Sequence, residues 1–324
     1  MFRFGPIGDL LRWILELIYR VIPNYGWAVI VFTLLIRILL LPFDIKSKRS
    51  MKRTAAIQPQ LDALNKKYAN DREKLAQKQQ ELYRREKINP LSGCLPMLLS
   101  MLILFQMFYV MREISDEEII TQVLSIKEAL DSGVTNFKPV LQPFLWIKNV
   151  FQPDSFMSTV LPASSTALQT ITKASGAITT EMIETAKTFL DSEAYQSWAL
   201  ANGNEIVYTG MMLFWTIKIP KVMNGLFILP VLSAVSQFLS SKIMNAGQSG
   251  AQNEQAAATN KMMKWFFPLF SLWICASSTA GFALYWVASN LIQMIEQFLL
   301  GKWIDHSDKK KQQQNELSKE AEPP

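Results

Sequence analysis

Five long apolar runs, separated by segments rich in charge, constrain this chain more than any other feature of its sequence. The runs cover residues 25–43, 94–111, 225–243, 262–276 and 280–300. The first, second and fifth approach the roughly 20 residues that a helix needs to cross a bilayer. The third and fourth contain Pro230 and Pro268, and the fourth is the shortest run, so these two require tilting, membrane thinning or shielding by neighbouring helices. This pattern predicts an all-α polytopic membrane protein with five core transmembrane helices.

Composition supports this fold class and argues against several kinds of site. Hydrophobic residues make up 49% of the 324 positions, yet 33 Lys or Arg and 27 Asp or Glu remain, which indicates segregated apolar and charged segments. Cys94 and Cys275 both lie in apolar runs, which argues against a disulfide framework. The single histidine, His306, lies in a polar tail. We therefore expect no metal site, and the absence of a glycine-rich phosphate loop argues against a nucleotide cofactor.

Charge asymmetry between two polar segments predicts the orientation of the chain. Residues 44–88 carry 13 Lys or Arg against 6 Asp or Glu, whereas residues 113–205 carry 5 Lys against 12 Asp or Glu. Because basic loops stay on the cytoplasmic side of a membrane, the first segment is expected inside and the second outside. The N-terminus then lies outside, and the C-terminus lies in the cytoplasm.

These assignments divide the chain into ten segments. They are an N-terminal interfacial helix (1–23), a first span (24–43), a cytoplasmic helical hairpin (44–90), a second span (91–112), an extracytoplasmic loop with interfacial segments (113–224), a third span (225–243), a cytoplasmic loop (244–261), a fourth span (262–277), a fifth span (279–300) and a cytoplasmic tail (301–324). The interfacial helix is predicted because Arg12, Glu16 and Arg20 recur every four residues opposite an apolar stripe. Within the outer loop, residues 181–201 predict one amphipathic helix, and residues 206–217 are apolar but too short to span.

The basic hairpin has two physical interpretations. Ala69-Asn70-Asp71 can turn the chain between two helices, and Asn89-Pro90 ends the second helix. The positive charge of the hairpin can bind nucleic acid, including ribosomal RNA. Its position beside the bilayer makes anionic lipid headgroups a sufficient partner, so we expect no specific nucleic acid.

Arg37 is the charged residue set inside the first apolar run, in the stretch VFTLLIRILLLPF. A charge at the bilayer centre costs about 2.5 kcal/mol or more on insertion scales. One explanation is snorkelling, because Arg37 lies roughly 9 Å before Phe43 on a helix, and a long side chain can cover most of that distance. The other explanation is a polar environment supplied by the remaining spans.

Those spans do supply polar residues at helical spacing. No acid lies deep in a span to neutralise the arginine, and Glu296 is placed near the inner end of the fifth span. Each polar residue alone is more often a helix–helix hydrogen bond than a functional site. Together they can line a wet cavity that receives an anionic guest. The candidate groove residues are Arg37, Thr33, Gln106, Ser233, Gln237, Trp286, Asn290 and Gln293, and Ser289 shares one side of the fifth span with the last three.

An ordered set of motifs resembles the YidC insertase family, the bacterial relatives of the mitochondrial and thylakoid insertases. The motifs are NYGWAVIVFTLLIRILLLPFDIKSKRSMKRTAAIQPQLDALNKKY, INPLSGCLPMLLSMLILFQMFY, FLWIKNVFQPDSF, GLFILPVLSAVSQFLSSKIM, and FFPLFSLW followed by GFALYWVASNLIQMIEQ. The resemblance covers residues 20–112, 141–156 and 223–300. It implies five core helices around a hydrophilic groove that is closed to the outside but open to the cytoplasm and to lipid.

The resemblance also implies a function and roles for particular residues. The groove arginine of the family falls on Arg37, a substrate-contacting hydroxyl on Thr33, the third-span glutamine on Gln237 and the fifth-span aromatic on Trp286. A protein of this kind is a membrane protein insertase and chaperone of the bacterial plasma membrane. It passes short hydrophilic tails of nascent integral membrane proteins through the groove and releases the apolar helix to lipid, without nucleotide hydrolysis. The implied partners are nascent membrane proteins and the bilayer, with the Sec translocon and the ribosome (through the hairpin and loops) as further candidates.

Three departures from the family pattern stand out. About 67 residues, 157–223, separate the QPDSF motif from the third span, where many members have almost none. The tail 301–324 is charge-balanced, whereas some relatives have strongly basic tails. Gram-negative members have a large folded outer domain ahead of the first span, and we expect none here.

Two other classes of protein are compatible with an intramembrane arginine. A small-molecule transporter or channel can use Arg37 as an anion site, but inverted repeats of broken helices, which favour that class, are not visible. An intramembrane hydrolase needs a base, and the spans contain no His and no suitably placed acid. We therefore expect no catalytic residue and no enzymatic activity.

Overall fold

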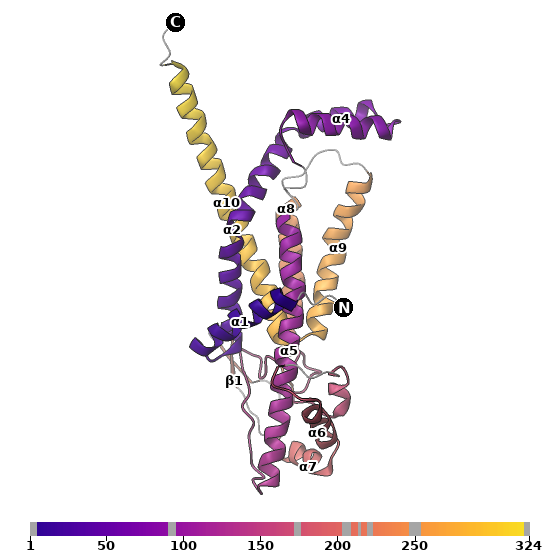
Figure 1. Ribbon diagram of the computed structural model, residues 1–324, viewed down its shortest axis with the longest axis vertical. Coiled ribbons are helices and arrows are strands. Elements are labelled where there is room, and N and C mark those ends of the chain that lie inside the picture. Colours follow the sequence, from indigo (N-terminus) through magenta and orange to yellow (C-terminus); the bar gives the residue numbers. More distant parts are fainter. Residues whose placement is uncertain are drawn as a thin grey trace. The chain divides into compact units, whose positions relative to one another are not determined.

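The computed structural model describes residues 5–89, 95–171, 176–202, 209–212, 215–218, 223–245 and 254–320. Within these ranges the chain is mostly helical, which confirms the all-α fold class, with one pair of short strands as the exception. The long helices are α2 (Tyr25–Ala56), α5 (Leu95–Asp131), α8 (Ile228–Asn245), α9 (Glu254–Ser277) and α10 (Ala280–Glu320) (Figure 1). The shorter elements are α1 (Gly5–Val21), α3 (Gln58–Lys67), α4 (Arg72–Arg85), the 3-10 helix η2 (Ser165–Leu168), α6 (Thr180–Leu190), α7 (Glu193–Asn202), β1 (Thr209–Met212) and β2 (Trp215–Lys218).

Each of the five apolar runs forms part of one long helix, and three of these helices extend well past the end of the run. Helix α2 continues to Ala56 with Pro42 inside it, α5 continues to Asp131, and α10 continues to Glu320. Charged residues such as Lys, Arg and Glu are good helix formers, so the end of an apolar run does not end a helix. Among the described residues, α2 and the Leu98–Asp131 part of α5 are long and apolar enough to cross a membrane, while Ile228–Ile243 of α8 is apolar but shorter.

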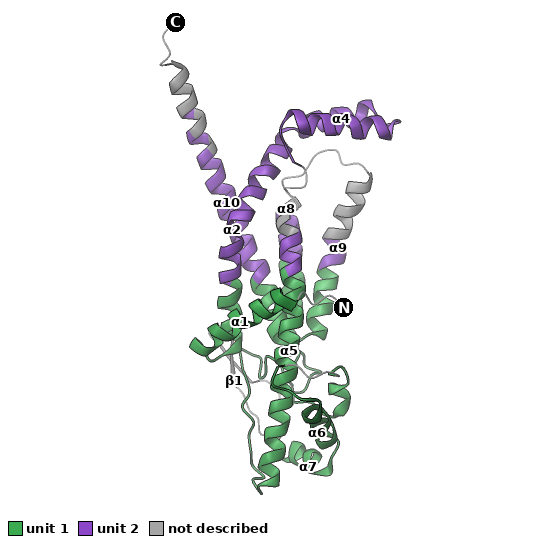
Figure 2. Ribbon diagram, in the orientation of Figure 1, with its two compact units in different colours: residues 1–33, 103–236, 268–288 green, residues 34–102, 237–267, 289–324 purple. Residues whose placement is uncertain are grey.

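The chain forms two compact units (Figure 2), of which unit 1 comprises residues 1–33, 103–236 and 268–288. Its core contains fully buried side chains from several elements, among them Phe32, Met107 and Phe282. The rings of Phe108 and Phe282 meet edge to face with their centroids 5.0 Å apart. Such ring pairs add about 0.5–1.5 kcal/mol to the burial of their apolar area.

Helix α1 of unit 1 has two apolar faces. Gly8, Leu11 and Leu15 are buried, whereas Trp13 and Leu17 on the other side are 60% and 46% exposed. A helix that buries one apolar face against its own protein and exposes a second apolar face is suited to the boundary between lipid and water. This arrangement is compatible with the predicted interfacial helix.

The outer loop, residues 113–224, differs from its prediction at one place, and the interfacial location of residues 206–217 stays a prediction. The single helix predicted over 181–201 is wrong, because the chain forms α6 and α7 with a break at Asp191-Ser192. The carboxylate of Asp191 accepts hydrogen bonds from the amide and hydroxyl of Ser165, which fixes the break. The predicted interfacial segment 206–217 overlaps two antiparallel strands, β1 and β2, in which Met212 pairs with Trp215.

Unit 2 comprises residues 34–102, 237–267 and 289–324 and contains the basic segment after Phe43. There α3 and α4 pack against each other, as expected for two helices joined by a turn. The small core between them consists of Ile57, Leu61, Leu82 and Ile88, with Leu64 and Tyr83 partly buried beside it. Asp71 accepts a hydrogen bond of 3.0 Å from the amide of Lys74 and so caps the start of α4.

Candidate functional site

Arg37 of α2 is buried in unit 2 and is hydrogen-bonded to α10. Its side chain is 6% exposed. Its Nη2 donates to the hydroxyl of Ser289 over 2.7 Å and to Oε1 of Gln293 over 3.3 Å. Ser289 and Gln293 are four residues apart and therefore occupy the same face of α10. The other terminal nitrogen, Nη1, is buried and has no hydrogen-bond partner among the described residues.

Two acidic residues of unit 2 act on the charge of Arg37. Asp44 of α2 and Glu296 of α10 are 4% and 9% exposed. The two carboxyl groups interact electrostatically with each other and with Arg37. Glu296 lies near the end of the fifth span, as the sequence indicated, and Asp44 directly follows the first span, so neither acid lies deep within a span. Asp44 follows Arg37 by seven residues, which is two helical turns, and this spacing is the sequence signal that could have placed it on the same face.

Further contacts join α2 and α10 beyond these residues. Lys48 donates to Oε1 of Gln297 over 3.1 Å, and the guanidinium of Arg49 lies 5.4 Å from the ring centroid of Trp303. Lys52 pairs with Asp305 over 2.8 Å, although both side chains are largely exposed and the pair therefore contributes little stability. Residue numbers rise together along the two helices, so α2 and α10 run parallel here.

Of the eight predicted groove residues, four belong to unit 2, namely Arg37, Gln237, Asn290 and Gln293. The structure brings Gln293 into contact with Arg37, and Asn290 is buried at 9% exposure. Gln237 is half-buried and forms no hydrogen bond with Arg37. Ser289, which sequence analysis placed on the correct side of the fifth span without including it among the groove residues, makes the shorter of the two bonds to Arg37.

The other four predicted groove residues, Thr33, Gln106, Ser233 and Trp286, belong to unit 1. Thr33 donates to the carbonyl of Val29 over 2.6 Å, and Ser233 donates to the carbonyls of Pro230 and Ser271 over 2.7 and 3.1 Å. Both hydroxyls therefore bond to helix backbones.

The two larger groove candidates of unit 1 are also buried. Trp286 is 6% exposed and packs against Phe282, and its Nε1 finds no acceptor among the described residues. Gln106 is 1% exposed, and its Oε1 lies close to Gly8, where an added Cβ would sit 3.3 Å from it. That all eight residues line one groove stays a prediction.

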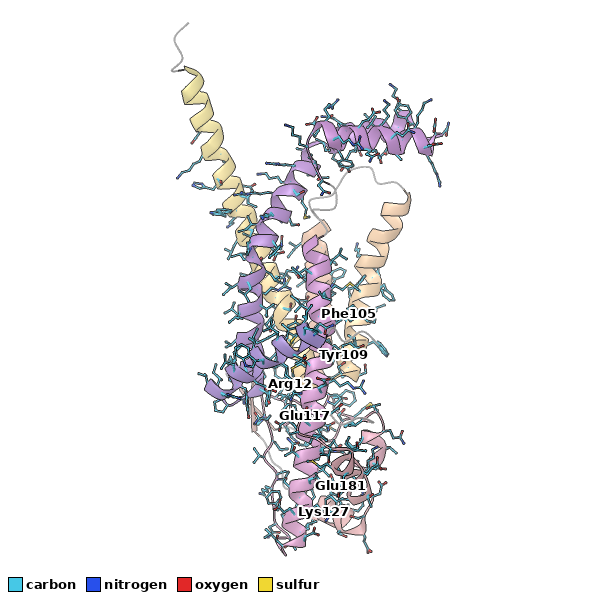
Figure 3. All side chains as sticks on the ribbon, viewed as in Figure 1. Arg12, Phe105, Tyr109, Glu117, Lys127 and Glu181 are labelled. Carbon is cyan, nitrogen blue, oxygen red and sulfur yellow. The ribbon has the colours of Figure 1, made fainter. Side chains whose placement is uncertain are left out.

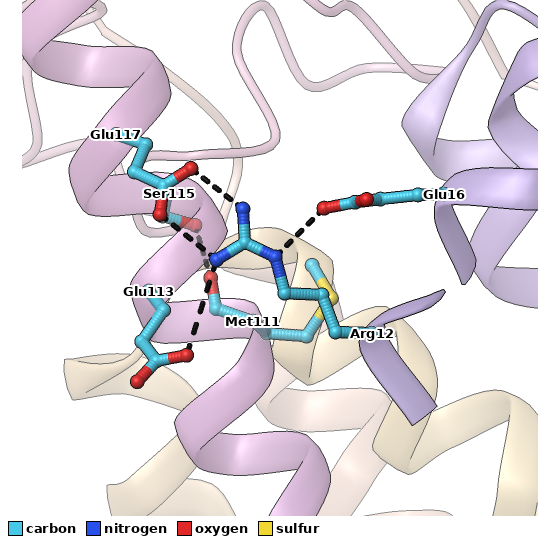
Figure 4. Close-up of polar contacts among 6 residues, drawn as sticks. All are labelled: Arg12, Glu16, Met111, Glu113, Ser115 and Glu117. Carbon is cyan, nitrogen blue, oxygen red and sulfur yellow. Dashed lines mark hydrogen bonds and ion pairs between the residues drawn. The ribbon is translucent and has the colours of Figure 1, made fainter. Parts of the chain in front are cut away.

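A second polar cluster, which sequence analysis missed, joins α1 to α5 in unit 1. Arg12 donates to both carboxylate oxygens of Glu117 over 2.8 and 2.7 Å and to Glu16 over 2.7 Å (Figure 4). Glu113 approaches to 4.0 Å. Figure 3 shows that Arg12 and Glu117 lie at the same level of unit 1. The hydrogen bond that Arg12 donates to Glu117 is the main cause that raises the pKa of the Arg12 guanidinium above its ordinary value.

Asp154 of the motif FLWIKNVFQPDSF caps the start of α8. This carboxylate is fully buried and accepts hydrogen bonds from the amides of Leu226, Phe227 and Leu229 over 2.8, 3.2 and 2.7 Å. It also accepts from Nε1 of Trp146 over 3.1 Å. Free amides and the positive end of the helix dipole make the start of a helix favourable for a carboxylate. Asp154 therefore fixes where the third apolar helix begins.

Long apolar helices, one of which carries a buried arginine, are typical of polytopic helical membrane proteins. Residues 17–310 match the family described as the 60Kd inner membrane protein. The chain therefore belongs to this family and is embedded in a membrane. This match confirms the resemblance seen in the sequence.

Three relatives agree in sequence with the family match. A membrane protein insertase YidC from Fusobacterium nucleatum is 27% identical over 92% of this chain and 97% of that protein. One from Caldanaerobacter subterraneus is 28% identical over 91% of this chain and 94% of that protein. One from Coxiella burnetii is 45% identical, but only over 33% of this chain and 19% of that protein. A crystal structure of an active YidC insertase aligns with a TM-score of 0.41 and 17% identity, over 91% of this chain and 46% of that chain.

Proposed function

We propose that this chain, as a membrane protein insertase of its family, receives acidic residues of a nascent protein's translocated tail at Arg37. The short polar tail crosses through a hydrophilic groove, and the apolar helix that follows it leaves sideways into lipid. Moving polar groups through lipid alone costs free energy for each group, so a polar path across part of the bilayer lowers the barrier. Hydrophobic partitioning and the membrane potential then drive the step without nucleotide hydrolysis.

The state of Arg37 is the observation that carries this proposal. Its Nη2 is bonded to Ser289 and Gln293, which hold the guanidinium in place against α10. Its Nη1 has no hydrogen-bond partner among the described residues, so the group retains donor capacity for a carboxylate. Charge-assisted hydrogen bonds between guanidinium and carboxylate are among the stronger polar contacts in proteins. These contacts favour a functional arginine over one that only snorkels to the headgroups.

Substitutions at Arg37 test the proposal. Arg37→Lys should retain much of the activity, because the charge matters more than the planar fork. Arg37→Ala should impair substrates with an acidic tail and spare matched substrates with a neutral tail. Arg37→Glu should be worse than Arg37→Ala, because like charges meet in a medium of low dielectric constant. The measurement is insertion of matched acidic and neutral tails, normalised to insertase abundance. Equal defects for both tails at Arg37→Ala would rule out charge pairing.

The orientation belongs to the same proposal, with the N-terminus outside and the hairpin α3–α4 and the C-terminal part of α10 in the cytoplasm. The excess of basic residues over 44–88 and of acidic residues over 113–205 supports it. Single cysteines introduced near residues 70 and 190 should react with an impermeant label from opposite sides of the membrane. Labelling of both from one side would overturn the orientation.

The hairpin is the proposed contact for the partners on the cytoplasmic side. Its small core of Ile57, Leu61, Leu82 and Ile88 is separate from the apolar runs, and most of its basic side chains are exposed. Such a surface suits anionic headgroups, the ribosome or the Sec translocon. Deleting the hairpin should leave a membrane-integrated, protease-resistant protein that inserts substrates poorly. Complete degradation of the deletion variant would instead assign the hairpin a structural role.

A further inference from the structure

The pair of buried acids beside Arg37 is the least explained feature of unit 2. Oδ2 of Asp44 and both carboxyl oxygens of Glu296 are buried, and the two carboxyl groups can form a hydrogen bond with each other only when they share a proton. A buried carboxylate is unfavourable unless an opposite charge or a hydrogen-bond donor compensates for it. Even when they share one proton, the two acids keep one negative charge, and this charge needs a compensating cation.

Helix geometry makes Arg37 that cation. Asp44 lies two turns after Arg37 along α2, and Glu296 lies nearly one turn after Gln293, which is bonded to Arg37. One turn after Asp44, Lys48 of α2 is hydrogen-bonded to Gln297 of α10, which holds the two helices together there. The carboxyl groups of Asp44 and Glu296 interact with each other and with Arg37. No ion pair within 4 Å joins Arg37 to either acid in the described part of the chain, so Arg37 acts on the two acids electrostatically and not through a direct contact.

We propose that Asp44 and Glu296 are the internal counter-charges of Arg37, with which the carboxylate of a substrate tail must compete. In the empty protein they compensate the buried guanidinium, and the guanidinium compensates them. When an acidic tail binds, its carboxylate contacts the guanidinium of Arg37 and weakens the electrostatic attraction between Arg37 and these two residues. Asp44 and Glu296 therefore set how acidic a tail must be before Arg37 holds it. This inference rests on the proposed role of Arg37 as a receptor for acidic tails.

Protein abundance tests the compensation of charge without any substrate. Arg37→Ala leaves two buried acids without their cation, so its steady-state abundance in the membrane should fall several-fold. Adding Asp44→Asn and Glu296→Gln removes the uncompensated charges and should restore most of that loss. The control adds Asp305→Asn to Arg37→Ala, because Asp305 is an exposed acid on the same helix and should restore nothing. A triple variant as scarce as Arg37→Ala, or restoration by Asp305→Asn alone, would overturn the proposal.

Substrate selectivity tests the competition. With Arg37 present, the Asp44→Asn/Glu296→Gln variant should insert acidic tails better relative to neutral tails, raising that ratio several-fold in reconstituted vesicles. The ratio should fall in Arg37→Ala, which shows that the assay detects the receptor. If it falls there but is unchanged in the Asp44→Asn/Glu296→Gln variant, the competition is refuted. If Arg37→Ala leaves the ratio unchanged, the proposed receptor role fails. Restored abundance in the triple variant would still support the internal counter-charges, so the two failures are distinguishable.

Discussion

The guanidinium of Arg12 donates two parallel hydrogen bonds to the carboxylate of Glu117, over 2.8 and 2.7 Å, across 105 residues of sequence (Figure 4). The side chains are 21% and 15% exposed. A bidentate pair fixes both the distance and the direction of the two groups. It therefore sets the rotation of α1 about its own axis, and with it the direction in which the exposed apolar face of α1 points.

The first prediction concerns this pair. Arg12→Ala and Glu117→Gln should each lower the thermal stability of the protein in detergent or nanodiscs. The double variant should lose less stability than the two single variants together, because both single variants break the same pair. The coupling energy should be about 1 kcal/mol, because the partners are only partly buried. Arg20→Ala is the matched control, since Arg20 is an exposed basic residue of the same helix. Full additivity of the Arg12 and Glu117 effects would contradict the pairing.

The second prediction concerns the pH dependence of stability at Asp116, which lies beyond the predicted second span. Burial raises the pKa of Asp116 to about 6, with Glu113 and Glu117 adding to the shift and Arg112 opposing it. Because the folded state holds this proton more tightly than the unfolded state, stability is lost as the pH rises through about 6.

Asp116→Asn tests this dependence because it removes the charge at similar size. The variant should match the wild type near pH 4 and exceed it at pH 8, by at most about 3 kcal/mol. The measurement is the difference in melting temperature between the two proteins from pH 4 to pH 8. A difference that does not change with pH would show that ionisation of Asp116 is not its cause.

The third prediction concerns Asp154 at the start of α8. Asp154→Ala removes the acceptor for three backbone amides and for the indole of Trp146, and should cost about 2 kcal/mol or more of stability. Asp154→Asn keeps one acceptor oxygen and should cost less. Asp191→Ala, at an exposed carboxylate of the same outer loop, should cost less still. Abundance and melting temperature of the three variants measure this order of stability costs. If Asp154→Ala matches the wild type in both, the capping role is excluded.

The fourth prediction concerns the close approach of α2 to the FLWIKN motif. A Cβ added at Gly26 would overlap the ring of Phe144, which is itself buried. Gly26→Ala should therefore lower the amount of folded protein, and Phe144→Leu should partly restore it. Gly5→Ala, where an added Cβ meets no atom within 4 Å, is the control. If Gly26→Ala melts like the wild type, the two segments do not approach so closely.

Sequence patterns predicted the helices better than they predicted their ends. Apolar runs identify where a chain prefers lipid, and each run proved helical. The ends of α2 and α10 were missed because a change from apolar to charged residues marks the limit of the lipid-facing part, not the limit of the helix. The break between α6 and α7 was missed because it depends on the contact of Asp191 with Ser165, 26 residues earlier.

The candidate site shows the same limit. Arg37 was found because a single charge within hydrocarbon is expensive, and Gln293 was found because polar residues recur at helical spacing. Asp44 could have been placed on the face of Arg37 from its spacing of seven residues along α2. The proximity of Glu296 depends on how α2 and α10 pair, which no local pattern of either helix contains. The pair of Arg12 and Glu117 was missed for the same reason.

The hydrogen bonds around Asp154 have a consequence for how this chain can change during evolution. The long segment after QPDSF begins and ends at one place, because the carbonyl of Ser158 accepts a hydrogen bond of 2.8 Å from the amide of Asn224, and Thr159 pairs with Met223. Since the two ends are already held together, adding or removing residues between them changes the loop entropy only slowly with length. Exposed positions between residues 160 and 222 should therefore accept inserted residues without moving the start of α8, whereas Leu190, Tyr195 and Trp198, which are buried within unit 1, should tolerate little change.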